Sequence, residues 1–134
     1  MRKSYRFLIP APKVNIKYLD EYGGKKFKQN DDKPFTGIVF DLSKETGNKI
    51  SETKYVQGIP HGKHVERYND GKKKVDGTYK SGVMDGKWTW YNEDEKTDSS
   101  GTYKDGKLDG KWTYWYENGE KWKEGTYKGG KEDG

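Results

Sequence analysis

Residues 111–128 read KWTYWYENGEKWKEGTYK, two runs rich in aromatic and β-branched residues on either side of Asn118-Gly119. Such runs favour strands, and Asn-Gly is a strong signal for a two-residue type I′ hairpin turn, which needs positive φ at both central positions. The stretch therefore predicts an antiparallel β-hairpin. Gly125 interrupts its second strand and predicts a β-bulge there.

The same phrases return at a period of 24 residues. Gly-Thr-Tyr-Lys occupies residues 77–80, 101–104 and 125–128, and Asp-Gly-Lys-Trp-Thr occupies 85–89 and 109–113. Residues 61–65 are a worn copy of the second phrase, and residues 35–40 resemble the start of a further unit. Glycines at 62, 86 and 110, two of them preceded by aspartate, predict turns. About four units of 24 residues therefore lie between residues 34 and 134.

Four hairpins in series predict an all-β fold, an antiparallel β-hairpin repeat that forms a meander or solenoid with a single-layer twisted sheet. Each unit would advance the sheet by about 10 Å, since neighbouring strands lie about 4.8 Å apart. Trp88 and Trp112 occupy equivalent places, and tyrosines recur at 55, 79, 103 and 127. Rings that repeat at one register should stack into ladders along one face, so Trp112 and Tyr114 are interpreted as scaffold.

Composition agrees with a thin fold. Only 28% of the 134 residues are hydrophobic, while 37% are charged and 15% are aromatic. Aromatic rings and the stems of lysine side chains can supply burial where aliphatic residues are few, so a thick two-layer core is not expected. The chain has no cysteine, which excludes disulfides and thiolate sites and fits a cytoplasmic protein. The apolar run at residues 7–9 is too short for a signal peptide.

Charge divides the chain into two regions. The net charge is +5, and residues 1–60 hold 12 basic and 7 acidic side chains, whereas residues 61–134 hold 15 of each. We therefore expect a basic N-terminal arm or strand pair over residues 1–33 and a repeat domain over residues 34–134.

The repeat resembles a known family. The chain is similar to bacterial proteins with the MORN repeat variant of the YwqK-family antitoxin type, over residues 34–134. Matching positions are Gly110, Trp112, Trp115, Tyr116, Asn118, Gly119, Glu124, Gly125, Tyr127, Lys128, Gly130 and Lys131. The resemblance implies a hairpin repeat that acts by contact with a partner, as an antitoxin, immunity protein or inhibitor of a toxin or effector enzyme. Residues 92–100 depart from the pattern, which predicts a mobile or partner-specific hairpin.

Catalytic chemistry is not expected. Nucleophile, phosphate-loop and dinucleotide motifs are absent from the sequence. The two histidines, His61 and His64, would point to opposite faces of a strand, and His64 is expected to replace the repeat tryptophan. The sequence therefore predicts neither an enzyme, nor a metal site, nor a cofactor.

Positions that vary between units are the better candidates for binding, because positions filled alike in every unit are explained by the fold. Arg67, Tyr91 and Trp115 share one register, and Trp122 shares another with Asp98 and Lys74. In strict alternation Trp115 points away from Trp112 and Tyr114. Arginine and aromatic side chains are frequent interface anchors. The candidate protein-binding residues are Arg67, Tyr91, Trp115 and Trp122.

Two other functions stay open. The N-terminal arm interleaves Arg2, Lys3, Arg6, Lys13 and Lys17 with aromatic residues, a mixture suited to RNA through phosphate contacts and base stacking. A peripheral membrane scaffold is the least favoured function, because Lys25, Lys26 and Lys28 would contribute only about 1 kcal/mol each near an anionic surface. Exposed sheet edges would also allow a homo-oligomer.

Overall fold

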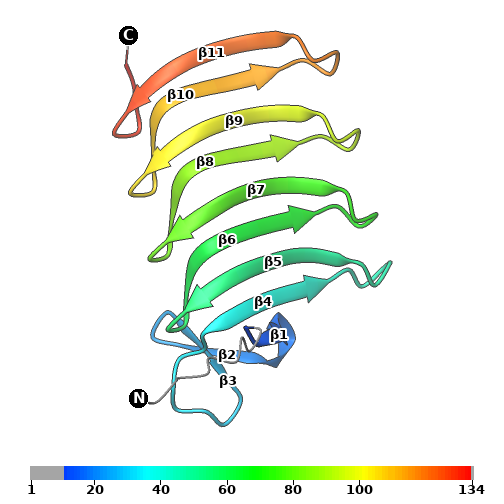
Figure 1. The fold of residues 1–134 in the computed structure, drawn as a ribbon, viewed down its shortest axis with the longest axis vertical. Coiled ribbons are helices and arrows are strands. Elements are labelled where there is room, and N and C mark those ends of the chain that lie inside the picture. Colours follow the sequence, from blue (N-terminus) through cyan, green and yellow to red (C-terminus); the bar gives the residue numbers. More distant parts are fainter. Residues whose placement is uncertain (1–10, 134) are drawn as a thin grey trace, which may run out of the picture.

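The structure, a computed structural model, describes residues 11–133. Within that range the chain forms one ten-stranded sheet in the order β1-β4-β5-β6-β7-β8-β9-β10-β11-β12 and a separate two-stranded hairpin, β2–β3 (Figure 1). All neighbouring strands pair antiparallel except β1 and β4, which are parallel. The predicted all-β meander is confirmed.

The strand bounds follow the repeat. The first region holds β1 (Lys13–Asn15), the 3₁₀ helix η1 (Ile16–Tyr18), β2 (Leu19–Tyr22) and β3 (Lys25–Lys28). The repeats hold β4 (Gly37–Leu42), β5 (Lys49–Val56), β6 (Ile59–Arg67), β7 (Lys73–Lys80), β8 (Val83–Tyr91), β9 (Thr97–Lys104), β10 (Lys107–Trp115), β11 (Lys121–Lys128) and β12 (Lys131–Glu132). The four long hairpins are therefore β4–β5, β6–β7, β8–β9 and β10–β11, which matches the four predicted units.

The turns at the two ends of the strands differ. The type I′ turn expected within a hairpin instead joins one hairpin to the next, at the other end of the strands. Asp105 and Gly106 have φ of 51° and 83°, the two positive values that a type I′ turn requires, and they join one hairpin to the next. At Asn118-Gly119 only Gly119 has positive φ. That loop is longer, because the Tyr116 amide donates to the Glu120 carbonyl and the Asn118 side chain accepts from the Glu120 amide.

The glycines at 62, 86 and 110 were predicted in turns, and this prediction is wrong. They lie inside β6, β8 and β10 with φ of 123°, 75° and 108°, next to shifts in the pairing with the preceding strand. Positive φ bends each strand at this bulge. The bulge predicted at Gly125 is also absent: Gly125 pairs regularly with Trp112, and the irregularity in that hairpin falls at Tyr114/Trp115.

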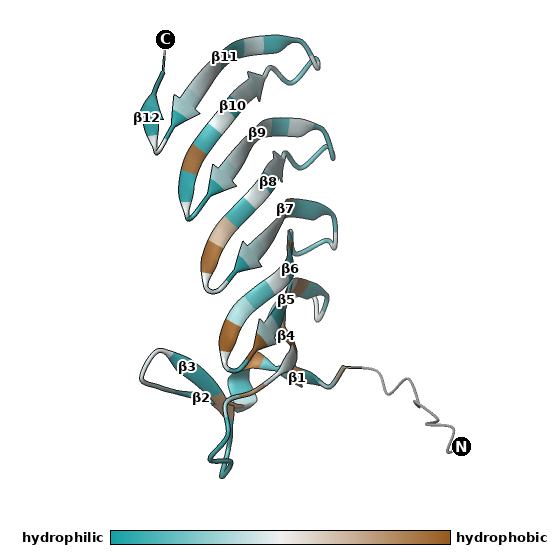
Figure 2. Cartoon of the chain, turned by 60° about the vertical axis from the view of Figure 1, so that its left-hand side comes forward, coloured by the Kyte–Doolittle hydropathy of each residue, from teal (hydrophilic) through white to brown (hydrophobic). Residues whose placement is uncertain are grey.

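One face of the sheet, here called the aromatic face, carries a continuous ladder of rings. Ring centroids lie 5.0 Å apart for Tyr79–Trp88, 5.4 Å for Trp90–Trp112 and 5.4 Å for Trp112–Tyr114. Trp88 is only 2% exposed, although no second layer covers the sheet within residues 11–133 (Figure 2). Offset and edge-to-face pairs of this kind stabilise beyond simple burial. The predicted ladder is confirmed, and its rings take the place of an aliphatic core.

Small residues make room for the ladder. In β9, Ser99 and Gly101 leave the backbone open, so that Trp90 and Trp112 meet across it from β8 and β10. Ser99 and Ser100 are both buried. A mobile or partner-specific hairpin was expected at residues 92–100. Part of this segment, Ser99 and Ser100, is instead buried in β9.

Residues 13–28 pack against the first repeat. Val14 and Leu19 lie on a cluster of buried residues formed by Phe35, Val39 and Tyr55. The backbone of β3 is joined to the repeat through hydrogen bonds from Phe35 N to Lys26 O (2.8 Å) and from Lys26 N to Gly58 O (3.0 Å). The boundary near residue 33 stays a prediction. The strand pair lies beside the first hairpin at the N-terminal end of the sheet (Figure 2), where Leu19 packs on the apolar cluster.

Candidate protein-binding surface

The face of the sheet opposite the aromatic ladder gathers lysines, and we call it the lysine face. Side chains alternate along a strand, and directly paired residues share a face. Lys63 and Lys87 lie in equivalent places in β6 and β8, opposite Thr78 and Thr102. Further cations extend the set at both ends. The lysine face comprises Lys13, Lys49, Lys54, Lys63, Arg67, Lys73, Lys87, Lys111 and Lys121 with the residues between them.

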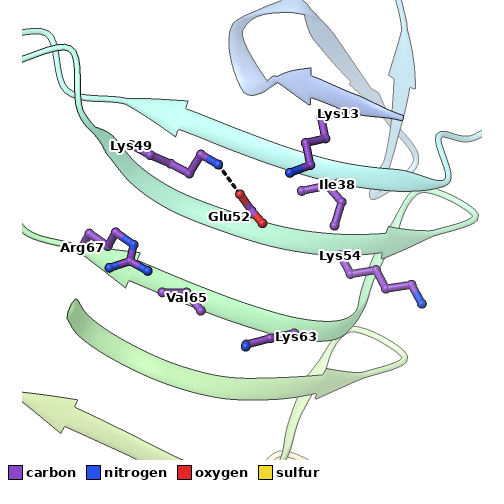
Figure 3. A pocket seen from close by; sticks show the side chains of 8 residues that line it. All are labelled: Lys13, Ile38, Lys49, Glu52, Lys54, Lys63, Val65 and Arg67. Atoms are coloured by element: carbon purple, nitrogen blue, oxygen red, sulfur yellow. Dashed lines mark hydrogen bonds and ion pairs between the residues drawn. The ribbon is translucent and has the colours of Figure 1, made fainter. Parts of the chain in front are cut away.

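A basic pocket of ≈ 410 Å³ lies at the N-terminal end of this face (Figure 3). Its walls come from β1, β4, β5 and β6. Its lining consists of Lys13, Ile38, Lys49, Glu52, Lys54, Lys63, Val65 and Arg67. Five cations thus surround one carboxylate, and that carboxylate is already paired with Lys49. The pocket therefore has a strongly positive lining that would favour an anionic group.

An ion pair recurs along the lysine face. Lys49 pairs with Glu52, Lys73 pairs with Asp76 at 3.0 Å, and Lys121 pairs with Glu124 at 2.9 Å. In two of these pairs the lysine changes the acidity of the carboxyl group: the hydrogen bond from Lys49 lowers the pKa of Glu52, and those from Lys121 and Lys111 lower the pKa of Glu124.

The third unit lacks this pair, because Thr97 and Ser100 stand at the corresponding positions. Among residues 11–133, no carboxylate lies within ion-pair distance of Lys54, Lys63 or Lys87. Seven further acidic side chains of the repeats lie in the long loops that join the two strands of each hairpin: Glu45, Asp70, Glu93, Asp94, Glu95, Glu117 and Glu120. The lysine face therefore presents positive charge that its own acids do not neutralise.

A second hollow of ≈ 350 Å³ lies further along the same face. Its walls include three lysines together with the indole of Trp115 and the small side chains of β9. Its lining consists of Lys87, Ser100, Gly101, Thr102, Lys111, Thr113, Trp115 and Lys121. Ser100 stands in this hollow where the other units have an acid, and Trp115 supplies an aromatic wall beside cations.

The four candidate protein-binding residues divide between the two faces. Arg67 and Trp115 lie on the lysine face, each in one of the hollows, and Tyr91 occupies the equivalent position in β8, next to the same irregularity in pairing. Trp122 lies on the aromatic face, where its ring packs against Tyr114 and Tyr116. It is 56% exposed. The structure therefore brings three of the four into one register and separates the fourth.

The residues predicted for RNA do not form one site within the described range. Arg2, Lys3 and Arg6 lie outside residues 11–133. Lys13 lines the basic pocket, whereas the Lys17 ammonium lies over the Tyr18 ring at 5.1 Å. Lys13 is thus the one member of this set that contributes to the lysine face.

Sequence reasoning missed the central lysines of this face. Lys63, Lys87 and Lys111 recur at the period of 24, and residues filled alike in every unit had been assigned to the scaffold. Their spacing in strands was a usable signal, because a repeated position on one face of a sheet builds a continuous row. The two histidines serve the fold instead: the His61 ring accepts from the Ser81 amide, and His64 lies between Thr53 and Glu66.

Within the part of the chain that the structure describes, no group of three or more metal-ligating side chains gathers. No helix among residues 11–133 has the length and apolar character needed to cross a bilayer. The features that remain are two extended faces and shallow hollows, which suit contact with another molecule.

Comparison with known proteins relates two of the hairpins to a known family. Residues 84–105 and 108–128 match the family model described as MORN repeat variant. Searches among curated proteins and among solved structures gave no match. The matched stretches run from β8 to the turn after β9 and from β10 to the end of β11, one hairpin each. Two consecutive hairpins of the sheet are therefore similar to the MORN repeat variant.

Proposed function

We propose that this chain is a non-catalytic binding protein of the antitoxin or immunity type, which neutralises a toxin or effector enzyme in the cytoplasm by direct contact. The observation that carries the proposal is the lysine face, where Lys54, Lys63 and Lys87 have no acidic partner among the described residues. An acidic surface on the partner would complement it. The resemblance of the repeats to YwqK-type antitoxins supports the neutralising role.

The shape of the surface supports a protein partner. The lysine face runs from β1 to β11, and its hollows bring an indole and a guanidinium beside lysine stems. Trp and Arg anchors surrounded by charged residues are typical of protein interfaces. Electrostatic complementarity would chiefly raise the association rate, so binding should weaken as salt increases.

The test is affinity capture from a host lysate with and without nuclease, using the tagged chain and a charge-reversed variant, Lys63→Glu with Lys87→Glu. Lys72→Glu with Lys96→Glu is the matched control, because those lysines lie in the long loops. We expect one protein at near-equal amount, resistant to nuclease, lost from the face variant and retained by the control. The captured enzyme should lose activity when the chain is added.

Three results would contradict the proposal. Recovery of RNA, or of proteins that disappear after nuclease treatment, would assign the cations to nucleic acid. Capture that is indifferent to the charge reversal would remove the lysine face from the interface. A captured enzyme whose activity is unchanged by the chain would overturn the neutralising role while leaving protein binding in place.

A further inference from the structure

The side chains of the lysine face form three rows that cross the strands. The middle row is unbroken, because each member is directly paired with the next: Glu52, Val65, Asp76, Thr89, Ser100, Thr113 and Glu124. Residues two positions apart in a strand share a face. On one side of the middle row the first outer row therefore holds Lys63, Lys87 and Lys111, and on the other side the second outer row holds Arg67, Tyr91 and Trp115.

Both hollows of the lysine face lie along the middle row. In the second hollow, Thr113 lies between Lys111 and Trp115, and Ser100 continues the floor into β9. The first hollow has the same arrangement two units earlier, with Val65 on its floor. The two hollows therefore follow one line across the strands. We call this line, with the outer rows as its sides, the cross-strand groove.

The centre of the cross-strand groove has a low, uncharged floor. Thr89, Ser100 and Thr113 follow one another in β8, β9 and β10. Each of the other three units has an acid at the position of Ser100 and a lysine at the position of Thr97. The strands β8, β9 and β10 are paired on both sides, so this part of the groove does not depend on where the sheet begins or ends (Figure 1).

The width and the period of the groove match an α-helix laid across the strands. The outer rows stand four residues apart along a strand, about 13 Å, and a helix with its side chains is about 10–12 Å wide. Neighbours within an outer row lie two strands apart, about 9.6 Å. Seven residues of a helix rise by about 10.5 Å and return to nearly the same face. One helix residue in seven would therefore meet each lysine of the first outer row.

Charge selects the residue that the lysines would meet. No carboxylate within residues 11–133 lies within ion-pair distance of Lys63 or Lys87, and Lys111 shares Glu124 with Lys121. An acidic side chain would complement these ammonium groups. On the opposite side of the groove the aromatic side chains of the second outer row recur at the same two-strand interval, which suits apolar side chains on the neighbouring stripe of the helix.

We propose that the cross-strand groove binds an α-helix of the partner protein, with acidic side chains at seven-residue intervals that face Lys63, Lys87 and Lys111 and with apolar side chains that face Tyr91 and Trp115. The proposal rests on the proposed function, because it takes the occupant to be a protein with an acidic surface. It adds the secondary structure of the contacting segment and the spacing of its acids.

The probe is an acetylated, amidated helical peptide built on alanine and glutamine, with glutamate at every seventh position and leucine three residues after each glutamate. The control peptide has the same composition, with its glutamates five residues apart, so that they point to different sides of the helix. Each is titrated into the ¹⁵N-labelled chain. We expect amide shifts centred on β8–β10 and binding of the first peptide at least about tenfold tighter than binding of the control.

Thr97→Lys with Ser100→Glu is the matched change in the chain. It gives the third unit the lysine and acid of the other three units, so it should fold, and it leaves the net charge unchanged. It should weaken binding of the first peptide by at least about tenfold, because it places a carboxylate on the floor of the groove. Thr97→Lys alone adds no acid and should keep the binding of the original chain or strengthen it.

Four results would overturn the proposal: no binding of the first peptide, equal binding of the two peptides, unchanged binding by the double variant, or amide shifts away from β8–β10. Tighter binding of an oligouridylate than of the first peptide would also overturn it and would assign the groove to RNA. The proposed function is judged separately, by capture from lysate. If the double variant still captures a protein that Lys63→Glu with Lys87→Glu loses, the proposed function stands and the helix proposal fails.

Discussion

Trp88 lies directly over Gly77, and a Cβ atom on that glycine would overlap the indole ring. The indole N–H donates to the Thr78 carbonyl at 3.1 Å, which fixes the ring across the neighbouring strand. This contact explains why a strand with a buried aromatic face keeps a residue without a side chain at its centre. Because Gly77 lies in the hairpin β6–β7 and Trp88 in the hairpin β8–β9, the contact also couples the stability of these two hairpins.

Gly77→Ala should destabilise the chain by about 1–3 kcal/mol, because the added methyl group overpacks against Trp88. Gly125→Ala is the matched control, since its Cβ atom has space. It should leave the free energy of unfolding unchanged or raise it by about 0.4–1 kcal/mol through the unfolded chain. Urea unfolding followed by tryptophan fluorescence measures both. Equal losses would show that the ring contact is not the cause.

Between the first two hairpins, Thr53 and His64 stand at the positions that Gly77 and Trp88 occupy one period later. Replacing this pair with glycine and tryptophan should give the same contact between ring and backbone. Thr53 stands in the glycine register, and its hydroxyl lies 2.6 Å from His64 Nδ1. His64→Trp alone should destabilise by about 1–3 kcal/mol, because Thr53 occupies the space that the indole needs. Thr53→Gly with His64→Trp should recover most of that loss. A double-mutant cycle should give a coupling energy of about 0.5–3 kcal/mol. Strictly additive changes would show that the side chain at position 53 and the ring at position 64 do not compete for the same space.

Stability should fall at alkaline pH because the ladder buries tyrosines. Burial raises the pKa of Tyr79 and Tyr103 above the usual 10.0. The unfolded chain then loses these protons first, so the stability that the neutral rings contribute is complete below pH 10 and is lost as pH rises through the higher folded-state pKa. Unfolding by urea at pH 8 and pH 11 should show the loss. Tyr79→Phe should reduce its size, whereas Tyr22→Phe, at an exposed site, should not.

The ion pair between Lys49 and Glu52 in the basic pocket should make the stability of the chain depend on pH under acidic conditions. The hydrogen bond from Lys49 lowers the pKa of Glu52 below 4.5. Its contribution to stability is therefore complete above that pH and is lost as pH falls through the lower folded-state value. Both side chains are partly exposed, so the loss should be no more than about 1 kcal/mol. Glu52→Gln should reduce the change in the free energy of unfolding between pH 5 and pH 3, measured by urea unfolding. An unchanged pH dependence would show that the ion pair does not contribute to stability.

Much of the fold could be predicted from the sequence, because its signals are local. A hairpin depends on the alternation of two neighbouring runs and on the turn between them, and both are written in consecutive residues. The period of 24 then places Trp88 and Trp112 at one register without knowledge of any distance. Even so, the type I′ turn was assigned to the wrong end of the strands. The two positive φ values fall at Asp105-Gly106, where one hairpin joins the next.

The binding surface was harder to predict, because face and register depend on bulges. The pairing shifts beside Tyr91 and Trp115, and these irregularities decide which side of the sheet the next residue faces. A shift of one residue exchanges the two faces of a strand. Trp122 was grouped with Trp115 because both positions vary between units, whereas the structure places the Trp122 ring on the aromatic face and Trp115 on the lysine face.

The amino-acid sequence by itself determined the repeat, the number of hairpins and the rings that replace an aliphatic core, because these follow from spacing along the chain. Only the tertiary structure decided that the lysines of four hairpins share one face and that Trp88 covers Gly77. Those relations join residues on different strands. They exist only after pairing has set the register between strands and has fixed which side chains lie over which backbone.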